Sequence, residues 1–156
     1  MNTKTKQETA PVTELAKHLD KLWGKARDIC DEFYEEYDRG YEELENEPFE
    51  CELSNARIRV EDGGRIAVDY SAVHVYDACA AYACGPYDEE ENADRAYARC
   101  RETCLEEAEN YAKRVLGEYR RAIKRWARKR GFAYTEKLRR DELNFTLAVE
   151  LHPAGD

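Results

Sequence analysis

Residues 93–126, ADRAYARCRETCLEEAENYAKRVLGEYRRAIKRW, decide the expected fold, because their apolar residues recur at steps of three and four. This spacing places them on one face of a helix. We expect a helix from near Asp88 to about Arg130, roughly 65 Å long at 1.5 Å per residue. Either it breaks at Gly117 or its exposed end meets a partner. The apolar positions are Ala93, Tyr97, Cys100, Cys104, Ala108, Tyr111, Val115, Tyr119, Ala122 and Trp126.

A second run of apolar residues at the same spacing starts at Val12 and predicts the first helix of the chain. Thr9 and Pro11 are its start signal, and the helix must stop before Pro48, because proline does not continue a helix. It tolerates Gly24 and ends or bends near Gly40. The result is one long helix that carries the N-terminal part of the core.

Short segments with alternating apolar residues predict strands at 49–53, 56–60 and 65–70. The two glycines of EDGG, between the second and third of these segments, indicate a hairpin turn. The segments 132–138 and 143–151 alternate in the same way, and RRDE between them closes a second hairpin. The sheet is therefore expected to be small and antiparallel.

The alanine-rich segment 72–86 predicts a short helix, because Ser71 precedes it as a helix N-cap and a Gly-Pro pair ends it. The expected fold class is then α+β, with two long helices and one short helix packed on a small antiparallel sheet of hairpins. Residues 1–11 are expected as a flexible N-terminus, and residues 12–152 as a single domain.

Composition and motifs argue against a membrane protein and against the enzyme classes that have recognisable sequence motifs. The chain has 156 residues, a net charge of −9 and only three histidines. It has no apolar stretch of membrane-spanning length and no signal peptide, so we expect a cytoplasmic protein with no membrane partner. The motifs GxGxxG, P-loop, HExxH and GxSxG are missing from the sequence. We therefore expect no enzymatic activity and no cofactor.

The six cysteines include a CxxxxC and a CxxxC motif, a spacing that permits a zinc site. If the short and long helices form a hairpin, however, Cys84 and Cys100 lie roughly 15 Å apart along the helix axis. That separation is too large for a shared ion. We therefore expect reduced cysteines buried in the core, with no metal site, in preference to disulfides.

Charge is strongly segregated along the chain. Residues 28–50 hold eleven acids and one base, and residues 113–130 hold nine bases and one acid. Basic residues at a helix C-terminus are favoured by the helix dipole, whereas acids there are not. The acidic half of the first helix also places like charges three and four residues apart, which destabilises a helix. Such violations of local rules are typical of functional sites.

The leading hypothesis is a non-enzymatic protein-binding domain whose acidic, tyrosine-bearing helix docks onto a basic partner. In size and composition, this small, acidic, tyrosine-rich chain resembles phage-encoded inhibitors that occupy a basic nucleic-acid channel. Anti-CRISPR and anti-restriction proteins are among them. The resemblance implies an inhibitor of a nucleic-acid-handling complex. The expected partner-binding residues are Asp31, Glu32, Tyr34, Glu35, Glu36, Tyr37, Asp38, Tyr41, Glu42 and Glu43.

Three alternatives stay open at this point. In the first, the basic end of the long helix binds nucleic acid through Arg121, Lys124, Arg125 and Arg128. In the second, the protein is an oligomeric scaffold, for example a homodimer. In the third, the basic end of the long helix lies against the acidic half of the first helix and neutralises it within the molecule.

Overall fold

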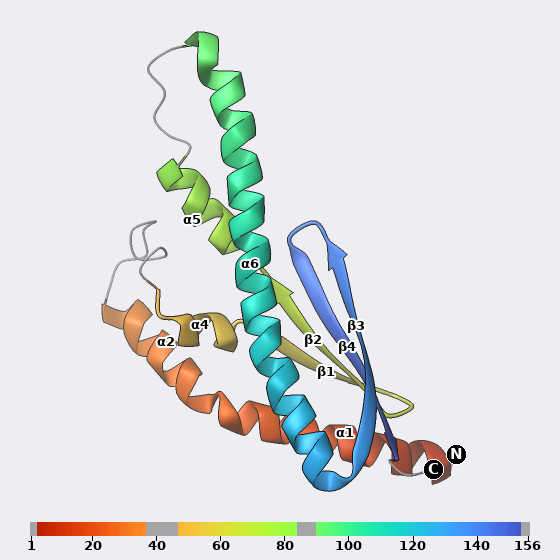
Figure 1. Ribbon diagram of the computed structural model, residues 1–156. Coiled ribbons are helices and arrows are strands. Elements are labelled where there is room, and N and C mark those ends of the chain that lie inside the picture. Colours follow the sequence, from red (N-terminus) through yellow and green to blue (C-terminus); the bar gives the residue numbers. More distant parts are fainter. Residues whose placement is uncertain (1–2, 37–46, 84–89, 154–156) are drawn as a thin grey trace.

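The computed structural model describes residues 3–36, 47–83 and 90–153, and it shows an α+β fold (Figure 1). Within these residues, five helices pack with a four-stranded antiparallel sheet, so the expected fold class is confirmed. The helices are α1 (Thr3–Leu22), α2 (Gly24–Glu36), α4 (Phe49–Ser54), α5 (Val73–Ala83) and α6 (Glu90–Arg130), and the strands are β1 (Arg57–Glu61), β2 (Arg65–Ser71), β3 (Phe132–Asp141) and β4 (Asn144–Pro153).

The sheet has the strand order β1-β2-β4-β3, and both expected hairpins are present. One row of apolar residues crosses all four strands, because Ile58 pairs with Val68, Val68 with Leu147, and Leu147 with Leu138. Paired residues of antiparallel strands point to the same side of a sheet. The register therefore gives the sheet one apolar face, as the alternation in the sequence predicts.

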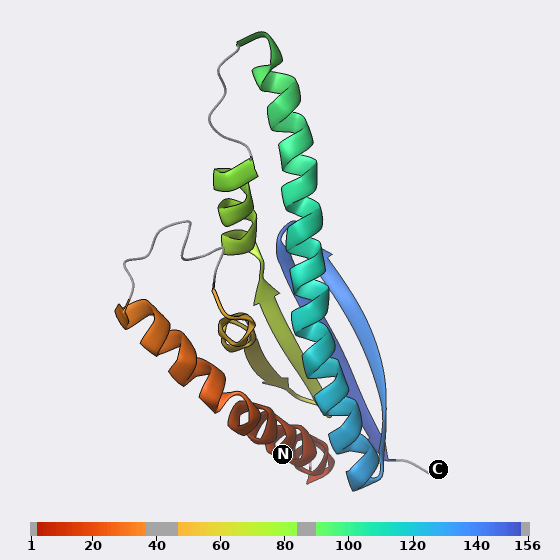
Figure 2. The same cartoon turned by 60° about the vertical axis from the view of Figure 1, so that its left-hand side comes forward.

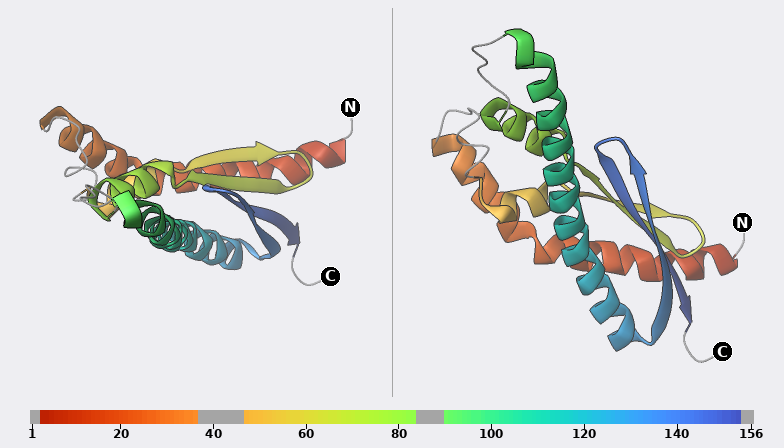
Figure 3. Two further views of the ribbon diagram at one scale, coloured as in Figure 1. Left: turned by 90° about the horizontal axis from the view of Figure 1, so that it is seen from above. Right: turned by 45° about the horizontal axis from the view of Figure 1, so that its top comes forward.

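The apolar face of the sheet meets α6 and α1, and the core lies between them. Figure 2 shows α6 running alongside the sheet, and Figure 3 shows it crossing α1. Helix α6 contacts β2, β3 and β4, whereas α1 contacts β1 and β2. The core cluster includes Leu15, Val68, Val115 and Leu147, each of them fully buried. Helices α1 and α6 therefore cover one face of the sheet.

The expected single N-terminal helix is wrong, because the structure divides it at Trp23 into α1 and α2. Gly24 follows directly, and glycine weakens a helix interior. The Trp23 ring packs on Tyr119 with its centroid 4.0 Å away, which holds the chain at the break. The expected start after Pro11 is also wrong, since α1 begins at Thr3 and contains Pro11. Buried Val12 is part of the packing that stabilises this region.

The segment 49–53, expected as a strand, forms the short helix α4 instead. Pro48 lies at its N-cap, and Glu50 and Glu52 lie in its first turn, where the helix dipole favours acids. Three consecutive residues, Cys51, Glu52 and Leu53, are buried. Burial of three residues in succession shows that α4 is enclosed on more than one side.

Helix α6 matches its expected range closely and does not break at Gly117. Helix α5 packs against it. Cys30, Cys51, Cys79 and Cys104 are not in disulfides, whereas Cys100 takes part in one, so reduced cysteines are not the rule for the whole chain. Among the described residues, every helix is either too short or too polar to span a bilayer.

Candidate functional site

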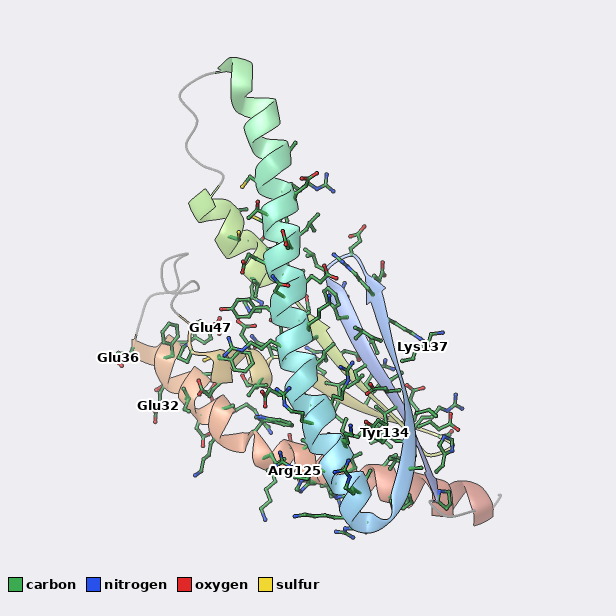
Figure 4. The ribbon with its side chains drawn as sticks, in the orientation of Figure 1. Glu32, Glu36, Glu47, Arg125, Tyr134 and Lys137 are labelled. Carbon is green, nitrogen blue, oxygen red and sulfur yellow. The ribbon has the colours of Figure 1, made fainter. Side chains whose placement is uncertain are left out.

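The outward carboxylates of helix α2 form the first candidate site. Buried Ala26 and Cys30 fix one side of α2 on the protein, which turns the opposite side to solvent. Figure 4 shows Glu32 and Glu36 pointing away from the body of the molecule. None of the exposed acids on this side has an ion pair within the described chain. We call this set, Asp31, Glu32, Glu35 and Glu36, the acidic α2 surface.

Only part of the expected partner-binding set belongs to this surface. Tyr34 is half-buried, and its hydroxyl donates a hydrogen bond to Glu47 Oε1 at 2.5 Å. Its hydroxyl is therefore engaged within the molecule, and its role in partner binding stays a prediction. The remaining expected residues lie outside the described part of the chain: Tyr37, Asp38, Tyr41, Glu42 and Glu43.

The basic end of helix α6 is the second candidate site. We call its exposed cations, Arg121, Lys124, Arg125 and Arg128, the basic α6 surface. Arg121 forms an ion pair with Glu118, and Arg125 is labelled in Figure 4. Within the described residues, the other three cations have no ion pair.

The basic end of α6 does not neutralise the described acids of α2. Its flanking arginines pair elsewhere: Arg130 Nη1 lies 3.4 Å from Glu14 Oε2 on α1, and Arg120 Nε lies 3.0 Å from Glu136 Oε2 on β3. Figures 1 and 2 show the reason, because this end of α6 lies beside α1 and β3 while α2 runs away from it. For the described residues, the third alternative of the sequence analysis is wrong.

A buried polar cluster, which sequence analysis missed, lies where α2, α4, α5 and β2 meet. Glu52 of α4 is 3% exposed and accepts hydrogen bonds from the Tyr70 hydroxyl and from His74 Nε2, the latter at 2.6 Å. Glu47 lies inward of α2, toward α6 (Figure 4), and its side chain is 1% exposed. Its Oε1 accepts the bond from Tyr34. Its Oε2 is buried, and a side-chain hydrogen bond between the Glu47 and Glu52 carboxyl groups helps to raise the pKa of Glu47.

Two cysteines adjoin the same cluster. Ligand atoms of Cys30, Glu47 and Cys51 all lie within 4.8 Å of one another, and so do those of Glu47, Glu52 and His74. Glu47 belongs to both groups. Carboxylate, thiol and imidazole are the donors that protein metal sites use. The described residues therefore hold metal-binding chemistry around one buried carboxylate.

Burial and neighbouring charges perturb the acids of the cluster. Burial raises the pKa of the Glu47 carboxyl to about 7; the charge of Glu52 adds to this effect, and the Tyr34 hydrogen bond opposes it. Burial also acts to raise the pKa of Glu52. The hydrogen bond and charge of His74, with the Tyr70 hydrogen bond, outweigh it and hold that pKa below its ordinary value. Burial raises the pKa of the Cys51 thiol.

The cluster can be reached from solvent through His74. The His74 and Tyr70 side chains line a surface cavity of about 680 Å³, together with Asp77 and Asn144. The exposed fraction of the His74 side chain is 22%, against 4% for that of Glu52. An ion or small molecule in this cavity would meet the imidazole before the carboxylates.

Sequence signals for this cluster are weak, because its residues come from four separate segments with no regular spacing. A strand at 49–53 would have pointed Cys51 and Glu52 to opposite sides. The helix α4 turns both inward, which no alternation pattern predicts. His74 resembled an ordinary packed or surface histidine until the fold placed it beside Glu52.

Comparison with known protein families, with curated proteins and with solved structures found no match to this chain.

Proposed function

We propose that the protein is a non-enzymatic binding domain whose acidic α2 surface docks onto a basic protein or nucleoprotein. One observation carries the proposal: four carboxylates lie exposed on one side of α2 with no ion pair among the described residues. No basic residue lies in the last turn of α2 to offset them. Clustered acids at this end of a helix cost stability, so a partner rich in arginine and lysine would relieve the repulsion.

The scaffold suits a rigid docking surface. The opposite side of α2 is held by buried Ala26 and Cys30, and α2 packs against α4. A surface that is ordered before binding loses less conformational entropy on association. The net charge of −9 would also steer the protein toward a basic partner and make association faster at low salt.

Within this proposal, the partner is a complex that handles nucleic acid, and the protein inhibits it. Channels for nucleic acid are lined with arginine and lysine, which contact phosphates. Carboxylates along a helix compete for the same cations. The small size, acidity and tyrosine content that the chain shares with phage-encoded inhibitors of the anti-CRISPR and anti-restriction kind support this view.

A charge-reversal pair tests the docking surface against a matched control. The purified protein captures its partner, and the affinity for the isolated partner is then measured for the wild type and two variants. Glu32→Lys/Glu36→Lys should weaken binding at least about tenfold, or 1.4 kcal/mol. The control Glu102→Lys/Glu106→Lys reverses two exposed acids with the same spacing on α6. Equal affinities of the two variants would contradict the proposal.

The second candidate function is nucleic-acid binding through the basic α6 surface. It is favoured by the exposure of Lys124, Arg125 and Arg128, whose charges have no ion pair among the described residues. A labelled duplex or single strand should then shift in a gel, with an affinity that falls steeply between about 50 and 200 mM salt. Substituting glutamine for these three residues should abolish the shift. No shift at micromolar protein in low salt would exclude this function.

A further inference from the structure

We propose that Cys30 and Cys51 form a disulfide in the folded protein when it meets a low-molecular-weight disulfide such as oxidised glutathione. This cross-link would join α2 to α4, two helices that already pack against each other. It would close the chain around residues 31–50, which lie between the two cysteines. The disulfide would hold the helix that carries the acidic α2 surface, but it does not depend on what that surface binds.

The first argument is the proximity of the two thiols. Cys30 lies on the buried side of α2 and Cys51 lies in α4, and their sulfur atoms are within 4.8 Å of each other. The two thiols also share a side-chain hydrogen bond. A disulfide requires the sulfurs to be about 2.05 Å apart. Rotation about the two Cα–Cβ bonds brings sulfurs that start this close toward that distance while both helices stay in place.

The second argument is that pairing of cysteines recurs in this chain. Cys100 already takes part in a disulfide. Cys79 of α5 and Cys104 of α6 share a hydrogen bond where those two helices pack together. Each cysteine that the structure describes therefore lies beside another cysteine or is already oxidised. A buried cysteine that acts only as a small apolar residue has no need of a second sulfur beside it. Conditions that maintain the disulfide of Cys100 are those in which a further disulfide can form.

The third argument is the surroundings of the pair. Burial and the neighbouring Cys30 thiol raise the pKa of Cys51, and the charges of Glu47 and Glu52 add to this effect. A lasting thiolate is therefore unfavourable at this position. A disulfide has no ionisable proton and no charge, so oxidation joins the two sulfurs without placing a charge beside the buried carboxyl groups.

Access from solvent sets the order of the exchange. Cys30 is 8% exposed, whereas Cys51 is fully buried. The Cys30 thiolate attacks one sulfur of oxidised glutathione, forms a mixed disulfide and releases one glutathione. Cys51 then loses its proton and attacks the Cys30 sulfur, so the Cys30–Cys51 bond forms and the second glutathione leaves. The two cysteines lose two hydrogen atoms in total, and oxidised glutathione is reduced to two thiols.

Peptide mapping of the native full chain tests the proposal. The reduced protein is freed of reductant, incubated with oxidised glutathione and a chelator, alkylated, and digested with trypsin without reduction. Cleavage after Arg39 places Cys30 and Cys51 in the separate peptides 28–39 and 40–57. These peptides should be recovered linked to each other, from protein that runs as a monomer in a non-reducing gel. Alkylated Cys30 and Cys51, or Cys30 joined only to glutathione, would overturn the proposal.

Two substitutions measure the effect of the cross-link. The melting temperatures of the wild type and Cys51→Ala should differ by roughly 6–12 °C more under oxidising than under reducing conditions, because a disulfide constrains the unfolded chain. The control Cys79→Ala changes a cysteine outside this pair that is in no disulfide, and it should leave the yield of linked peptides unchanged.

Equal differences in melting temperature under both conditions, or loss of the link in Cys79→Ala, would contradict the proposal. The comparison under reducing conditions removes the cost of the alanine itself. The peptide mapping uses the wild type, so it decides the question even if Cys51→Ala fails to fold.

Discussion

Removal of the Tyr70 hydroxyl should be unusually costly, because it donates a hydrogen bond to a buried carboxylate. Tyr70 is 1% exposed and Glu52 is 3% exposed. In Tyr70→Phe, Glu52 keeps its bond from His74 but loses the one to Oε2. Hydrogen bonds to charged groups contribute about 1.5–3 kcal/mol, so we expect a loss of about 2 kcal/mol in the free energy of unfolding.

A second tyrosine in the core provides the matched control. Tyr119 is 3% exposed, and its hydroxyl donates to the backbone carbonyl of Leu53 at 2.7 Å. This acceptor is neutral, so Tyr119→Phe should cost only about 1 kcal/mol. Both substitutions remove one oxygen from a buried ring and leave the ring in place. The difference between their losses in unfolding free energy therefore measures how much the negative charge of the acceptor adds to the hydrogen bond.

Urea unfolding followed by circular dichroism, at neutral pH with a chelator present, measures both variants. For a chain of this length, about 2 kcal/mol corresponds to roughly 4–8 °C in the melting temperature. In a Glu52→Gln background, the cost of Tyr70→Phe should fall to about 1 kcal/mol, because the acceptor is then neutral. Equal costs for Tyr70→Phe and Tyr119→Phe, or no change in that background, would refute the reasoning.

Three further substitutions test other parts of the structure. The hydrogen bond from Arg59 lowers the pKa of Asp69, so the stability it contributes is present above pH 4 and is lost as pH falls through the folded pKa. Asp69→Asn should therefore flatten the acid side of a pH–melting profile. Ile123→Ala removes a fully buried side chain of α6 and should cost about 2–5 kcal/mol in urea unfolding. Gly131→Ala should lower the melting temperature by a few degrees, at about 1 kcal/mol, because Gly131 has φ 76°.

The long helix and the two hairpins could be predicted from the sequence. Helix α6 and the strands have regular apolar periods, and the buried residues Cys104, Ala108, Val115 and Trp126 are members of the predicted stripe. The charge segregation is also a property of the sequence, and the exposed acids of α2 are part of it. Periodicity succeeds for these elements because each one packs a single face against one neighbouring layer.

Only the tertiary structure decided where the chain breaks and what its irregular segments bury. The apolar spacing continues through Trp23, and the break depends on the packing of that ring on Tyr119, a residue distant in the sequence. The strand-like pattern at 49–53 lies in helix α4, which follows Pro48 and buries Cys51, Glu52 and Leu53. That change alone placed Cys51 and Glu52 together beside Glu47. The sequence by itself determined the elements with one buried face, while the buried polar cluster arose from contacts between four segments whose spacing along the chain carries no period.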